Sequence, residues 1–84
     1  MSDAERLYRA LAATAERPVE RSASRLLGEA EAVADDLRDC GPAVQRERAA
    51  VVLELLEEVD GTGDEEADRR VETARRIAAD LATE

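Results

Sequence analysis

The sequence predicts an all-α protein: an antiparallel four-helix bundle with a short first helix, alone or as half of a dimer. Apolar residues recur at steps of three and four, the period of helices buried on one side, and no segment alternates as a strand would. Residues that start or stop helices separate the periodic segments, and short connections favour antiparallel neighbours. Residues 1–84 fit a single helical domain, because so short a chain cannot build two ordinary cores.

The first helix is predicted to begin at a capping box made by Ser2 and Glu5 and to run to about Glu16. Pro18 then breaks it or starts the next helix, since proline suits only the first turn. One side of this first helix carries Ala4, Leu7, Tyr8, Leu11 and Ala15.

The second helix has the strongest pattern, and its apolar side runs from Val19 to Cys40. Gly41 is predicted to stop it and Pro42 to start the third helix, which makes a tight turn. Cys40 ends the apolar side, so we interpret it as a small buried group rather than a reactive thiol. The apolar side consists of Val19, Ala23, Leu26, Ala30, Val33, Leu37 and Cys40, widened by Leu27 and Ala34.

The third helix is predicted over residues 42–59, with a core-facing side of Val44, Val51, Val52, Leu55, Leu56 and Val59. Thr62 with Glu65 forms a second capping box, and acidic residues follow in the first turn, where the helix dipole favours them. Arginines stand later in this fourth helix, in the order that a helix prefers. Its apolar side is Ala67, Val71, Ala74, Ala78 and Leu81, with Ile77 beside it.

The charge is strongly negative: 21 Asp and Glu stand against 12 basic residues, all arginine, for a net charge of −9. This composition is typical of halophilic archaea, in whose cytoplasm concentrated salt screens the repulsion; an acidic actinobacterial origin is the alternative. A single cysteine indicates a reducing compartment, and no apolar run is long enough to cross a bilayer. We therefore expect a soluble cytoplasmic protein.

Composition also excludes several chemistries. The chain has no histidine, so it lacks an imidazole base and histidine metal ligands, and it has no lysine for Schiff-base chemistry or a P-loop. We expect a non-enzymatic protein with no catalytic residues, no metal site and no cofactor.

The loop "EVDGTGDEEADRR", residues 58–70, combines glycines with carboxylates and raises the question of a cation or phosphate site. Laid on the EF-hand pattern from Asp60, it has Glu65 where glycine is needed and Val71 where a bidentate glutamate is needed. Acidic residues already occupy the positive end of the following helix, which disfavours phosphate. We interpret the loop as a connector.

Glu54 with Glu57, and Glu65 with Asp68, form two acidic pairs around the predicted hairpin. The pattern resembles that of the all-α nucleoside triphosphate pyrophosphohydrolases of the MazG-like group, which implies a magnesium-dependent enzyme as the alternative function. The sequence departs from that family: the gap between the pairs is too short, and Glu54 and Glu57 are expected on the solvent side of their helix.

Arg17, Arg21 and Arg25 fall on successive turns opposite the apolar side of the second helix. As a nucleic-acid contact this set is small and lacks interleaved aromatic residues, so nucleic acid is an unlikely partner, although a small nucleic-acid-associated regulator is a further alternative. A solvated face is the preferred interpretation, with Arg25 and Glu29 spaced for an ion pair.

The segments "PVERSASRLLGEAEAVADDL" and "ELLEEVDGTGDEEADRRVETARRIA" resemble those of a family of small acidic haloarchaeal proteins with no assigned function. The resemblance implies a helical cytoplasmic protein and carries no site residues.

We predict a helical interaction module with a homo-oligomeric or unidentified protein partner. Leu53 lies about 120° from the centre of the expected core side of its helix, at 100° per residue, and so has no expected place inside. Ala49 and Ala50 widen this patch. A chain without Phe or Trp also gains by burying more area through pairing. The sequence therefore predicts a homodimer interface at Leu53, Ala49 and Ala50.

Overall fold

The computed structural model describes all 84 residues and contains four helices and no strand, which confirms the predicted fold class. The first helix is the shortest, as expected. The helices are α1 (Asp3–Thr14), α2 (Arg21–Leu37), α3 (Pro42–Glu57) and α4 (Glu65–Thr83).

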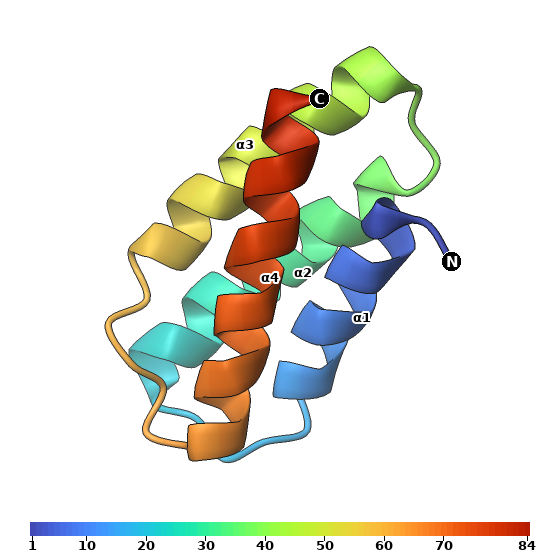
Figure 1. Ribbon diagram of the computed structural model, residues 1–84. Helices are drawn as coiled ribbons and strands as arrows, with labels where there is room; N and C mark the ends of the chain where they lie inside the picture. The colour runs from blue at the N-terminus through green and yellow to red at the C-terminus, as the bar shows by residue number, and fades with distance from the viewer.

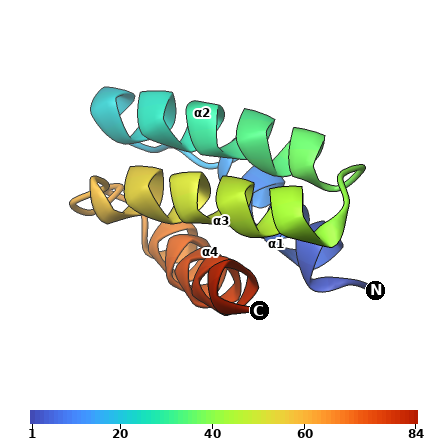
Figure 2. The ribbon, with the colours of Figure 1, turned by 90° about the horizontal axis from the view of Figure 1, so that it is seen from above.

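Successive helices run in opposite directions, as the colour gradient of Figure 1 shows. α1 packs against α2 and α4, and α3 also packs against α2 and α4. Figure 2 shows α2 and α3 side by side, whereas α4 is seen nearly end-on and therefore crosses the α2–α3 pair obliquely. We group the helices into two pairs, α1 with α4 and α2 with α3, and the pairs pack against each other through the α3–α4 and α1–α2 contacts.

The core is one cluster of 18 buried residues, eight of them alanine. Alanine buries little area, but it lets helix backbones approach closely, so leucine, valine and isoleucine can fill the remaining space at high density. The larger members of the cluster are Leu7, Leu11, Leu27, Leu37, Val52, Leu56, Val59, Val71, Ile77 and Leu81.

Local signals start α1 and α3 as predicted. The Ser2 hydroxyl caps α1 by accepting the backbone N–H of Glu5 at 3.1 Å, whereas the Glu5 carboxylate bonds Arg9 and Arg38 instead of completing the capping box. Pro42 begins α3. Gly41 is the residue before that helix rather than the end of α2, because α2 already stops at Leu37.

Neighbouring helices supply hydrogen bonds at the C-terminal ends of α2 and α3, where backbone carbonyls lack helical partners. The Gln45 amide, on α3, donates to the Leu37 carbonyl at 3.0 Å. The Arg75 guanidinium, on α4, donates to the carbonyls of Leu56 at 2.8 Å and Val59 at 3.0 Å. These three hydrogen bonds fix how α2 and α3 end and tie them to the rest of the bundle.

The predicted core side of α3 is partly wrong. Val52, Leu56 and Val59 are buried as expected, but Val44 and Val51 are 39% and 42% exposed. α3 has apolar residues around much of its circumference, so its sequence alone does not fix which side faces inward. Packing between α2 and α4 selects the side that contains Val52 and Leu56.

Candidate functional site

An exposed row of side chains runs along α3. Val44, Arg48, Val51 and Leu55 follow one another at steps of four, three and four residues, so they lie on one side of the helix. Apart from Met1, Val44 and Val51 are the exposed large apolar residues of the chain, and Leu55 is half-buried against the core. We call these four residues the α3 row. Its 4-3-4 spacing is visible in the sequence, but the same spacing is typical of a core-facing side, so the sequence does not mark the row as surface.

Beside the end of α3, the start of α2 adds apolar surface and the connection after α3 adds acidic surface. Leu26 and Val33, seven residues apart on one side of α2, are half-buried. A hollow of about 360 Å³ opens between the start of α2 and the end of α3. It is lined by Glu20, Ser22, Ala23, Leu26, Glu58, Val59, Asp60 and Gly61.

Arginines without an ion pair concentrate on the same pair of helices. Seven of the 12 arginines form salt bridges, among them those of α1 and most of those of α4. The other five are Arg21, Arg25, Arg46, Arg48 and Arg76, and all but Arg76 lie on α2 or α3. The α2–α3 surface therefore combines exposed apolar groups with arginines that form no ion pair within the chain.

The structure corrects the predicted interface patch. Ala49 is completely buried in the core, so it cannot form part of a surface. Leu53 is half-buried and packs against the core, and Ala50 is exposed. The premise that Leu53 has no place inside was wrong because the buried side of α3 is rotated toward it. Self-association itself stays a prediction.

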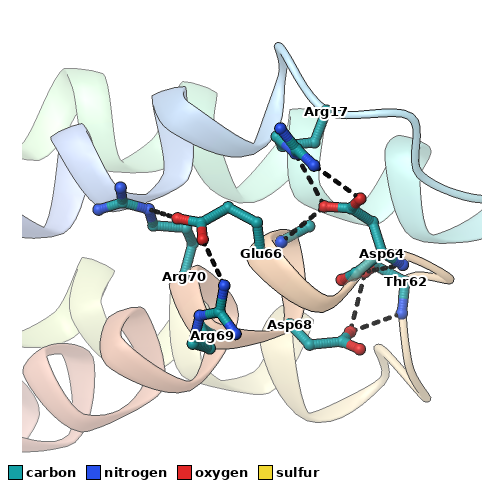
Figure 3. A network of polar contacts seen from close by, with 8 residues as sticks. Arg17, Thr62, Asp64, Glu66, Asp68, Arg69 and Arg70 are labelled. Carbon is teal, nitrogen blue, oxygen red and sulfur yellow. Dashed lines mark hydrogen bonds and ion pairs between the residues drawn. The ribbon is translucent and has the colours of Figure 1, made fainter.

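The loop between α3 and α4 is held by a network of polar contacts (Figure 3). Thr62 is fully buried; its backbone N–H donates to Asp68 Oδ1 at 2.9 Å, and its hydroxyl lies 2.8 Å from the same oxygen. Gly61 and Gly63 have φ of +86° and +84°, a left-handed conformation that favours glycine. Between these two turns, Thr62 is buried and is bonded to Asp68, so both side chains stabilise the connection.

The predicted capping box at Thr62 and Glu65 is wrong. Asp64 is the N-cap of α4, and its carboxylate accepts the backbone N–H of Ala67 at 2.9 Å. The left-handed turn at Gly63 separates Thr62 from the helix, so the next residue able to cap takes the position.

Arg17, from the connection between α1 and α2, forms a bidentate pair with the same Asp64 carboxylate, at 2.9 Å for both contacts. The Arg17 guanidinium, and secondarily the Ala67 N–H, lower the pKa of Asp64 to about 2. The Glu20 backbone N–H also donates to the Thr62 carbonyl at 2.8 Å. The two connections at this end of the bundle are thus joined directly.

The four carboxylates of the pyrophosphohydrolase comparison do not converge on one centre. Glu54, Glu57 and Glu65 are exposed, and Asp68 is engaged by Thr62. No group of three or more acidic, histidine or cysteine side chains in the structure is placed to hold a metal ion. The geometry therefore lends no support to this alternative.

The three arginines of the predicted ladder do not lie on one helix or share one role. Arg17 lies outside α2 and pairs with Asp64, whereas Arg21 and Arg25 are exposed on α2. Cys40 is only half-buried, in the turn after α2, with Sγ 3.5 Å from the Asp36 carbonyl oxygen. None of the four helices is long and apolar enough to cross a membrane.

Comparison with known proteins gives one match. No curated protein and no solved structure matches the chain. A family model described as a domain of unknown function, DUF8152, matches residues 3–84, which include all four helices. The chain therefore belongs to the DUF8152 family.

Proposed function

We propose that this protein is a non-enzymatic helical interaction module that self-associates through the α3 row. The single observation that supports it is the exposure of Val44 and Val51 on the same side of α3 as Arg48 and the half-buried Leu55. This arrangement leaves apolar area in water that a second helix can cover. A core rich in alanine gives the chain further reason to bury area by pairing.

Sedimentation of wild type and Val51→Glu at high micromolar concentration tests the proposal. A glutamate at Val51 would have to be buried without a partner in the assembly, so this variant should be monomeric where the wild type is dimeric. Ala50→Glu is the matched control, because Ala50 is also exposed but lies about 100° around the helix. It should remain dimeric. A monomeric wild type would contradict the proposal, and loss of pairing only in Ala50→Glu would move the interface from the α3 row to the side of α3 that carries Ala50.

We also propose that the protein works in concentrated salt. A net charge of −9 on so small a chain opposes compaction when it is unscreened, and screening shortens the Debye length to about 3 Å at 1 M. The helical circular dichroism signal and the melting temperature should therefore rise steeply from dilute buffer to molar KCl. A melting temperature that does not respond to KCl would contradict the halophilic assignment.

A further inference from the structure

We infer that two copies of this chain pair antiparallel along α3, with Arg48 of each copy against Glu58 of the other. The inference rests on the proposed self-association and adds its orientation and register. It starts from the α3 row, which continues to Glu58, the residue that caps α3 in helical conformation.

Val44, Arg48, Val51, Leu55 and Glu58 alternate steps of four and three residues, the spacing of a coiled-coil seam. The seam is apolar at Val44, positive at Arg48, apolar at Val51 and Leu55, and negative at Glu58. When Arg48 faces Glu58, Val44 lies beyond the end of the second copy's α3. In a twofold antiparallel pair, the register that opposes Arg48 and Glu58 also opposes Val51 and Leu55. The axis then passes at the level of Leu53.

A parallel twofold pair would instead oppose each residue to its own copy, because the symmetry keeps the two helices in register. Arg48 would then face Arg48, and Glu58 would face Glu58. The antiparallel arrangement replaces both repulsions with attraction, and it also opposes the two α3 dipoles favourably. Charge complementarity therefore selects the antiparallel orientation.

Both charged groups are available for a partner. Arg48 and Glu58 are exposed, and neither side chain takes part in an ion pair or hydrogen bond within the chain. Glu20 and Asp60 line the hollow beside Glu58, and their carboxylates strengthen the negative potential that the guanidinium meets.

One contact in this register is unfavourable, and it determines how the strength of dimerisation depends on salt. The Glu54 side chains of the two copies approach each other near the axis, and both copies carry net negative charge. Screening weakens this repulsion. The dimer should therefore tighten as KCl is added, while the short Arg48–Glu58 contacts still fix the orientation.

Exchanging the charges at Arg48 and Glu58 tests the antiparallel register. The dissociation constants of Arg48→Glu, Glu58→Arg and the double variant are measured by sedimentation, at the lowest KCl concentration at which the wild type is fully helical. Each single variant should dimerise about tenfold more weakly, because two attractive contacts become repulsive. The double variant restores opposite charges across the antiparallel seam and should return to within about threefold of the wild type. A double variant no tighter than the single variants would overturn the inference.

Arg46→Glu and Glu57→Arg are matched controls, since they make the same charge changes at exposed positions outside the seam. Both should dimerise like the wild type, and circular dichroism should show that every variant retains its helices. Equal weakening by the controls would assign the effect to net charge and overturn the inference.

Disulfide cross-linking separates this inference from the proposed function. In a Cys40→Ser background, a mixture of Val51→Cys and Leu55→Cys chains should cross-link readily, whereas Val51→Cys alone should not. Efficient cross-linking of Val51→Cys to itself would overturn the antiparallel register but leave self-association intact. A wild type that stays monomeric would contradict both.

Discussion

The α1–α4 pair and the α2–α3 pair stabilise their helix ends differently. α1 and α4 each begin with a side-chain cap, Ser2 or Asp64, followed by acidic residues in the first turn. α2 and α3 begin with neither. Short-range ion pairs follow the same division: α1 and α4 contain five, whereas α2 has one, between Asp35 and its C-cap Arg38, and α3 has none.

The two helix pairs also differ in which side chains they leave exposed and unpaired. Caps and short-range ion pairs stabilise α1 and α4 locally. α2 and α3 depend instead on packing and on hydrogen bonds from other helices, such as those of Arg75. The exposed valines and four of the five unpaired arginines lie on the second pair, which is why the proposed interface is placed there.

The largest expected effect tests whether packing holds α3 in place. Leu56→Ala removes a fully buried side chain from α3 and should lower the free energy of unfolding by about 3 kcal/mol. Val51→Ala, at an exposed position of the same helix, should change it by less than about 0.5 kcal/mol in dilute, monomeric protein. Urea denaturation measures both. A cost below about 1 kcal/mol for Leu56→Ala would contradict the dependence of α3 on packing.

A smaller effect tests the caps. Ser2→Ala removes the hydroxyl that accepts the Glu5 N–H and should destabilise the protein by about 1 kcal/mol. Ser22→Ala is the matched control, because Ser22 stands in the first turn of α2, is exposed and makes no side-chain hydrogen bond. It should be close to neutral in the same denaturation experiment. Equal losses would remove the distinction between the two helix pairs.

The smallest expected effect concerns acid. Since the pKa of Asp64 is lowered to about 2 in the folded protein, the folded state binds its proton less readily than the unfolded state. The stability from Asp64 is therefore fully present above the ordinary aspartate pKa of about 3.9 and is lost as pH falls toward 2. Asp64→Asn should flatten this part of the stability–pH curve. Asp60→Asn, in the same loop but without a hydrogen bond, should keep the wild-type slope; identical slopes for all three proteins would contradict the assignment.

Much of the fold could be predicted because its signals act over one or two helical turns. The Ser2 cap, the start at Pro42 and the three-four apolar spacing each depend on neighbours close in sequence. They determined the number, order and approximate limits of the helices. Composition by itself excluded histidine and lysine chemistry, because the chain contains neither residue.

Tertiary structure decided which side of α3 is buried and which residue caps α4. Apolar residues surround much of α3, so only the positions of α2 and α4 could bury Ala49 and leave Val51 in solvent. At α4, the left-handed Gly63 moved the cap from Thr62 to Asp64, where Arg17 from a distant connection completes the contact. The candidate interface follows from the α3 orientation, which depends on packing between segments that are distant in sequence.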